Sequence, residues 1–237
     1  MRLPLRGLSD AELLRTLRVA RSSLDGFTRA THRHGSLIQS WVGGASVAAL
    51  EHYPDGGVVD RRHGSQFFYH CHRAGEAEHG HLHLFWHATR SGRRRHLRPQ
   101  AATGAGDWKR SAPSHLIAIG LDARGLPVSI FSVNHWVADG HWFDATTTLA
   151  MLRRFGLRMD GAHADSCAWL TAFVRLYEPV MARVLRARDR VLLDRPDHPA
   201  ALDDRRIEVV STARLNWSDD LSRLDAEVRS RGLDAAS

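Results

Sequence analysis

The sequence predicts an α+β fold in which an antiparallel β-meander of about four strands or more is covered on one face by helices. Between residues 66 and 137, apolar side chains alternate with polar or small ones in short runs, as expected of strands that bury one face. On both sides of this region the apolar residues recur at helical spacing. The change of period along the chain therefore indicates a sheet flanked by helices.

Length and composition are those of a globular protein. The chain has 237 residues, of which 43% are hydrophobic and 25% charged, which is enough to bury a core. We expect one domain over 1–237, with an N-terminal helical segment (1–50), a histidine-bearing antiparallel sheet (51–142) and a mainly helical C-terminal part (143–237). No apolar run reaches the ~18 residues that cross a bilayer, and the start lacks the apolar core of a secretory signal. We therefore expect no membrane partner and a cytoplasmic location.

The helices are predicted from caps and apolar spacing. Ser9 and Glu12 form an S-x-x-E capping box, which places a helix start there, with an end near Thr31. For 36–50 a short helix and a bent segment both remain open. Further helices are expected over 144–154, from Asp165 or Ser166 to about Leu192 with a kink at Pro179, and over 218–231. The segment 206–215 alternates weakly and is expected to add an edge strand, whereas 51–60 carries a turn signal at Pro54.

The most informative stretch is Gln66 to Trp86, which we interpret as a β-hairpin connected by residues 73–78. Its histidines occupy alternate positions on both sides of the turn, and apolar residues fill the positions between them. In the register that keeps the two kinds apart, the facing pairs are His72 with His79, His70 with His81, and Phe68 with His83. This register places five imidazoles on one face.

Crowded imidazoles predict a transition-metal site. Side chains that face each other across a ladder have Cβ atoms roughly 5 Å apart, so several protonated rings would repel one another. Neutral imidazole nitrogen is a good ligand for iron, copper and zinc, and the sequence does not distinguish among these metals. The candidate ligands are His70, His72, His79, His81 and His83.

A second hairpin is predicted over 114–137, with its turn at 122–125. The register in which Asp122 pairs with Leu126 gives the second hairpin two faces. The histidine face is then continued by Ala118, Gly120, Ser132, Asn134 and Trp136. The opposite, apolar face then takes Ile117, Ile119, Leu121, Phe131 and Val133, and His115 and His135 also point to that side. The candidates for catalytic residues beside the metal are Tyr69, Asn134 and Trp136.

Three functions fit this pattern. The favoured one is a metal-dependent enzyme acting on a small molecule or peptide, with a slight preference for oxidation because Tyr69, Trp86, Trp136 and Trp142 lie nearby. The second is a metal-free enzyme, since HGHLHLFW from His79 resembles the H-x-H-x-H signature of the histidine-triad nucleotide hydrolases and transferases. That resemblance implies that His81 is the nucleophile and that His79 and His83 support it. The third is a protein that binds a metal without turnover.

The net charge of +7 comes mainly from arginine, and the densest block runs from Arg90 to Arg98. Such a block can bind phosphate or nucleic acid, but it is equally typical of a solvated loop. We do not expect nucleic acid as a partner, and the sequence does not indicate an oligomeric state.

Several segments together resemble a known family. The elements are YHCHR from Tyr69, EHGHLH from Glu78 and NHWV from Asn134, within a stretch from Glu51 to Trp142. They are similar to the Y-H-x-H-R, E-H-G-H-x-H and N-x-W-V elements of a family of bacterial proteins of unknown function. The resemblance implies a shared histidine site and no particular reaction.

Overall fold

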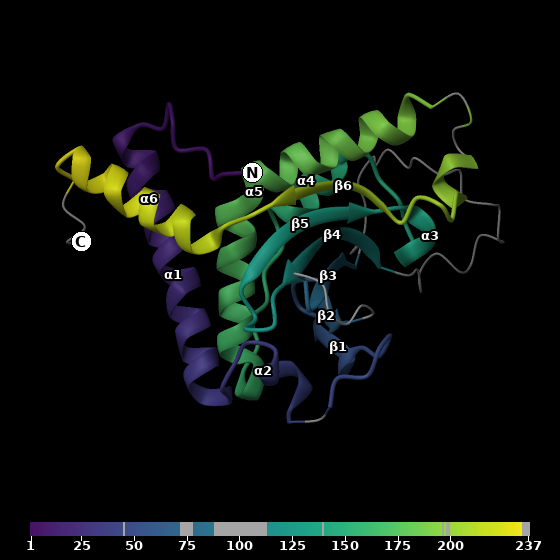
Figure 1. The fold of residues 1–237 in the computed structure, drawn as a ribbon, viewed down its shortest axis with the longest axis horizontal. Coiled ribbons are helices and arrows are strands. Elements are labelled where there is room, and N and C mark those ends of the chain that lie inside the picture. The colour runs from purple at the N-terminus through teal and green to yellow at the C-terminus, as the bar shows by residue number, and fades with distance from the viewer. Residues whose placement is uncertain are drawn as a thin grey trace.

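The protein folds as a six-stranded antiparallel sheet with helices packed against it, which confirms the predicted α+β class (Figure 1). The computed structural model describes residues 1–44, 46–71, 78–87, 113–138, 140–195, 197 and 200–233. The strands follow chain order across the sheet: β1 (Tyr53–Asp60), β2 (Ser65–His70), β3 (Gly80–Trp86), β4 (Ser114–Leu121), β5 (Pro127–Val133) and β6 (Val209–Arg214). The helices are α1 (Asp10–His34), α2 (Gln39–Val42), α3 (His135–Ala138), α4 (Ala145–Leu152), α5 (Ala164–Leu193) and α6 (Trp217–Ser230), with short 3-10 turns η2 (Gly161–His163) and η3 (Ala200–Asp203).

Helix α1 begins at the predicted capping box. The Glu12 amide donates to the Ser9 hydroxyl oxygen, and the Ser9 amide donates to the Glu12 carboxylate at 2.8 Å. At Gly26 the helix crosses α5 so closely that a Cβ atom would lie 2.7 Å from the backbone nitrogen of Trp169. Glycine therefore allows the two long helices to pack backbone against backbone.

Helix α5 contains Pro179, which lacks the amide hydrogen that the preceding turn requires. Figure 1 shows that the helix bends part-way along its length, so that its first part runs beside α1 and its second part runs along the sheet beside β6. The kink expected at Pro179 explains how one helix follows two surfaces.

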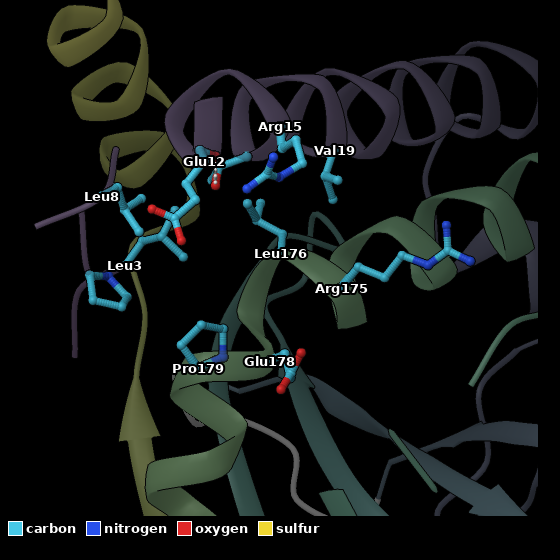
Figure 2. Close-up of a pocket in the computed structure, with 11 residues that line it drawn as sticks. Leu3, Leu8, Glu12, Arg15, Val19, Arg175, Leu176, Glu178 and Pro179 are labelled. Atoms are coloured by element: carbon cyan, nitrogen blue, oxygen red, sulfur yellow. Dashed lines mark hydrogen bonds between the residues drawn. The ribbon is translucent and has the colours of Figure 1, made fainter. Parts of the chain in front are cut away.

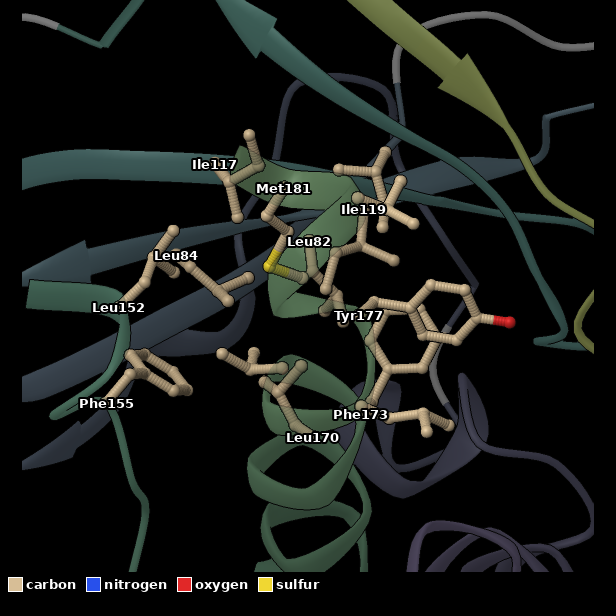
Figure 3. Packing of buried hydrophobic residues seen from close by; sticks show 14 of the residues in the cluster. Leu82, Leu84, Ile117, Ile119, Leu152, Phe155, Leu170, Phe173, Tyr177 and Met181 are labelled. Carbon is tan, nitrogen blue, oxygen red and sulfur yellow. The ribbon is translucent and has the colours of Figure 1, made fainter. Parts of the chain in front are cut away.

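The core lies between the sheet and α5. Buried side chains from β3 and β4 face those of the helix, together with residues around the end of α4 (Figure 3). Each is removed from water almost completely, which stabilises the fold by roughly 1.5–3 kcal/mol per side chain. The residues drawn there include Leu82, Leu84, Ile117, Ile119, Phe155, Leu170, Phe173 and Met181.

The hairpin formed by β2 and β3 has the predicted register. His70 faces His81, Phe68 faces His83 and Tyr69 faces Leu82. Because the side-chain period is two, His70, His81 and His83 share one face, and the helices cover the other.

The second hairpin differs from the prediction by one residue. An irregularity between Gly120 and Leu121 pairs Ala118 with Phe131 and Gly120 with Ser129. The prediction that Phe131 and Val133 lie on the apolar face was therefore wrong, because Ala118 also faces His83. Ser132 moves to the opposite face for the same reason.

A second irregularity, between Leu84 and Phe85, corrects the position of His115. The shift pairs Phe85 with His115, which turns the His115 imidazole to the histidine face instead of the apolar face. Such local shifts in pairing reverse side-chain direction and carry almost no sequence signal.

Strand β1 and the end of strand β5 were not predicted. The segment with the turn signal at Pro54 forms strand β1, whose pairing shifts between Tyr53 and Val58 around two glycines of positive φ. Strand β5 ends at Val133, and the residues after it form helix α3 rather than a continued strand. Within the described ranges, no helix has the length and apolar character that crossing a membrane requires.

Candidate metal centre

Three histidines bring their ring nitrogens together on the sheet face opposite the helices. The Nε2 atom of His70 lies 2.8 Å from Nε2 of His81 and 3.1 Å from Nε2 of His83. Their candidate ligand atoms all lie within 4.8 Å of one another. His70 comes from β2 and the other two from β3, so the hairpin register itself assembles the group.

The spacing of these nitrogens matches metal coordination. With metal–nitrogen bonds of about 2.0–2.1 Å, two nitrogens at right angles around one ion lie about 2.9 Å apart, and two at the tetrahedral angle lie about 3.4 Å apart. The two observed distances are closer to the first value. The Nε2 atom of His70 therefore lies at a distance from each of the other two nitrogens that suits two ligands of one ion.

A carboxylate orients His81 from behind. Glu78 Oε1 lies 2.8 Å from His81 Nδ1, and Glu78 Oε2 accepts a hydrogen bond from the Ser129 hydroxyl at 3.0 Å. Gly120 leaves the space for this contact, since a side chain there would collide with the Glu78 carboxylate and the Ser129 hydroxyl. Because a carboxylate only accepts, Nδ1 carries the proton and Nε2 keeps its lone pair.

His83 is oriented by a second buried imidazole. Its Nδ1 lies 2.9 Å from Nε2 of His115. Burial, helped by the neighbouring His115 and His81, lowers the pKa of His83 well below its usual range. Burial and the nearby Arg188 lower the pKa of His115 to about 3. Both rings are therefore neutral at pH 7, as a metal ligand and its hydrogen-bonding partner should be.

Aromatic rings surround the three imidazoles. Ring centroids of Phe68 and His83 are 5.3 Å apart, and those of Phe131 and His81 are 5.2 Å apart. Phe85 packs against Phe68 at 5.3 Å and against His115 at 5.2 Å. The centre thus lies in a largely apolar setting, which strengthens electrostatic interactions within it.

His79, a predicted ligand, takes another direction. Its Nδ1 lies 2.6 Å from the Tyr69 hydroxyl, and Tyr69 lies fully buried on the helix-covered face, stacked on Trp41. A side chain at Gly80 would collide with the Tyr69 hydroxyl. The residue between His79 and His81 therefore lets the tyrosine reach past the strand.

The remaining candidates lie elsewhere. The Asn134 amide donates to the Ala201 carbonyl at 2.9 Å, and the Trp136 indole donates to the carbonyls of Asp204 and Ile207 at 3.0 Å. These bonds hold α3 against the η3 segment. His72 and the block Arg90–Arg98 lie outside the described residues.

Glu78 and His115 contact two of the candidate ligands, and the sequence interpretation did not include them in the site. Glu78 was placed in the hairpin connection, but its carboxylate contacts His81, which lies three residues further along the chain. His115 had no such signal, because only the pairing shift beside Phe85 turns it towards His83.

The molecule also has a cavity of about 350 Å³ between the N-terminal segment, α1 and α5 (Figure 2), and none of these histidines lines it. Leu3, Leu8, Leu176, Glu12 and Glu178 are among the residues that line it. Glu12 is hydrogen-bonded to Ser9, and Glu178 pairs with Arg153 at 2.8 Å. Contacts within the chain thus already engage both carboxylates.

Comparison with known proteins places the chain in a family. The model of a family described as a domain of unknown function (DUF6969) matches residues 17–215, which include every strand of the sheet. The chain belongs to this family. A family of unknown function, which the sequence elements had indicated, is therefore confirmed. Searches of the curated proteins and of the solved structures found no match.

Proposed function

We propose that this member of the family is a metal-dependent enzyme in which His70, His81 and His83 bind one transition-metal ion through their Nε2 atoms. The observation that carries the proposal is the convergence of the three imidazoles, in which His70 Nε2 lies 2.8 Å and 3.1 Å from the Nε2 atoms of His81 and His83. Iron, copper and zinc all accept such a ligand set, and the positions left open would take water, dioxygen or substrate.

Proton positions support a cation at this point. Glu78 fixes the proton of His81 on Nδ1, so its Nε2 presents a lone pair towards His70. The tautomer of His83 with its proton on Nδ1 would donate to His115 Nε2 and leave its own Nε2 free to coordinate. One proton on His70 can bridge to only one of these nitrogens at a time, whereas a metal ion accepts all three lone pairs together.

The surroundings favour oxidation of a small molecule over hydrolysis. Acyl and phosphoryl transfer need polar donors aimed at the developing negative charge. Apart from Glu78 and His115, which contact the Nδ1 atoms of His81 and His83, the described side chains packed against the three imidazoles are the aromatic rings of Phe68, Phe85 and Phe131 and small residues such as Ala118. An apolar setting that excludes water suits oxidative chemistry, in which reactive species must be protected.

The geometry gives less support to the second hypothesis, a metal-free enzyme that resembles the histidine-triad nucleotide hydrolases and transferases. A nucleophilic His81 would need its Nε2 directed at a substrate phosphorus, but this atom lies 2.8 Å from another imidazole. The partner of Nδ1 is a carboxylate that itself is held by Ser129. A metal ligand and the carboxylate that orients it would make the same contacts.

Metal analysis of protein purified without added metal tests the proposal. We expect near one equivalent of a transition metal in the wild type and at least a tenfold loss of affinity in His81→Ala. His32→Ala, which removes an exposed histidine of α1, is the matched control and should retain the metal. A wild-type protein that takes up no iron, copper or zinc would contradict the proposal.

The supporting carboxylate gives a second, finer readout. Glu78→Gln keeps the size of the side chain but removes the charge behind His81, so metal affinity should fall about 10- to 100-fold. Oxygen uptake by the iron and copper forms, compared with ester hydrolysis by the zinc form, then separates oxidation from hydrolysis. Full metal content without either activity would indicate a protein that only binds metal.

A further inference from the structure

We infer that the stacked pair of His52 and Phe68 marks the binding place of a planar aromatic ring, so that the substrate is a small aromatic molecule with an acidic oxygen substituent. The inference rests on the proposed metal centre and names the class of molecule that reaches it. In this hypothesis the substrate ring stacks on the ring of Phe68, and the His52 ring occupies the stacking position when no substrate is bound.

The two rings lie almost parallel. Their centroids are 3.8 Å apart with an interplanar angle of 19°, which is the geometry of face-to-face stacking. The Phe68 ring also contacts two candidate ligands, with centroids 5.6 Å from His70 and 5.3 Å from His83. A ring stacked on Phe68 is therefore adjacent to the metal centre.

His52 is the least restrained ring of the group. It is exposed and precedes β1, and within the described part of the chain its contacts are the ring contacts with Phe68 and His70. An aromatic contact of this kind contributes only about 0.5–1.5 kcal/mol. A planar ligand that stacks equally well can therefore displace it.

Burial across the site shows the side from which a ligand approaches. His81 and His83 are buried, with 6% and 3% of their surface exposed. His70 and Phe68 are half-buried, and His52 is exposed. Exposure thus increases from β3 towards β1, and the His52 ring covers the open side of the Phe68 ring.

The position of His52 shows that a ring there reaches the centre. Its centroid lies 5.5 Å from that of His70. An aromatic ligand in the same place would set its substituent beside the converging Nε2 atoms. Three neutral imidazoles leave the charge of a metal ion uncompensated, so an anionic oxygen such as a phenolate or carboxylate is the complementary substituent.

Benzoate and cyclohexanecarboxylate test the inference, because they share a carboxylate and a six-membered ring but only benzoate is planar. Calorimetric titration should show that the wild type binds benzoate more tightly, and that Phe68→Leu loses this preference. His52→Ala should bind benzoate about two- to tenfold more tightly, because no ring competes for the stacking position. Phe27→Leu, a change of the same kind on α1, is the matched control and should behave as the wild type.

Both metal-loaded and metal-free protein should be titrated, so that the two proposals fail separately. A preference for benzoate without metal binding would support the ring site and overturn only the metal centre. Equal binding of the two acids by protein that has taken up its metal would overturn the ring site alone. An unchanged preference in Phe68→Leu, with folding verified by circular dichroism, would also overturn it.

Discussion

The two faces of the β2–β3 hairpin differ in what their side chains must do. On one face, Phe67, Leu82 and Leu84 are completely buried against the helices and contribute apolar area. On the other face, His81 and His83 are almost as buried, but each is fixed by a specific partner at hydrogen-bonding distance. Burial alone therefore does not distinguish stability from function in this sheet; the chemical nature of the contacts does.

The difference follows from the pleat of the strands. Neighbouring residues of one strand point to opposite faces, so the seven residues of β3 contribute both to the core and, together with His70 of β2, to the candidate metal centre. Volume and hydrophobicity govern the helix-covered face, whereas direction, proton position and neutrality govern the histidine face. Substitutions on the two faces should accordingly change different measurements.

The largest expected effect belongs to the helix-covered face. Leu82→Ala removes a fully buried side chain and leaves a cavity beside α5, which should lower the free energy of unfolding by about 2–5 kcal/mol. Metal content of the folded fraction should not change. Urea unfolding and metal analysis on the same samples measure both quantities.

The control for this change is Leu24→Ala. The Leu24 side chain is 44% exposed, so its removal should hardly change the free energy of unfolding. If Leu82→Ala instead released the metal while the protein remained folded, the two faces would not be independent.

The sequence predicted the part of the molecule in which side-chain pattern and register agree. The alternation of His70, His81 and His83 with apolar residues determines the hairpin register, because a slip of one residue would bury imidazoles among leucines. The capping box of α1 and the kink at Pro179 are likewise local signals.

The missed features depend on contacts that are distant in sequence. His115 reaches the centre only through a pairing shift between β3 and β4, and Phe131 through another between β4 and β5. Neither shift has a local signature. The direction of His79 depends on Tyr69, a residue of the preceding strand, and on the absence of a side chain at Gly80.

A second prediction concerns a charge on the apolar side of the sheet. Asp60 is buried at the end of β1, opposite Ser65, and accepts hydrogen bonds from the Arg158 amide at 2.8 Å and from the His63 amide at 3.0 Å. Burial raises the pKa of this carboxyl, but the bonds from Arg158 and His63 outweigh it and hold the pKa below its usual value of 3.8. Asp60→Asn should therefore lower the free energy of unfolding by about 1.5–3 kcal/mol at pH 7.

The pH dependence of this effect has a defined sign. Since the pKa of Asp60 is lower in the folded protein, the carboxylate stabilises the fold above the unfolded-state pKa and loses this contribution as the pH falls below 3.8. The difference in free energy of unfolding between the wild type and Asp60→Asn should therefore become smaller in acid. Asp55 is exposed, so Asp55→Asn should differ little from the wild type at any pH. A difference that stays constant from pH 7 to pH 3 would show that the charge is not responsible.

The smallest expected effect lies where the two faces meet. The Tyr69 hydroxyl is hydrogen-bonded to His79 Nδ1, and burial, together with Cys71 and Glu78, raises the pKa of that hydroxyl and keeps it protonated. Tyr69→Phe should lower the free energy of unfolding by about 0.5–1.5 kcal/mol and leave metal affinity unchanged, because it removes one hydrogen bond and no ligand. A double-mutant cycle with His79→Ala should show that the two changes are coupled by a similar amount. If His79→Ala instead lowered metal affinity as much as His81→Ala does, His79 would bind the ion in solution, and the separation between a structural and a functional face would not hold at this residue.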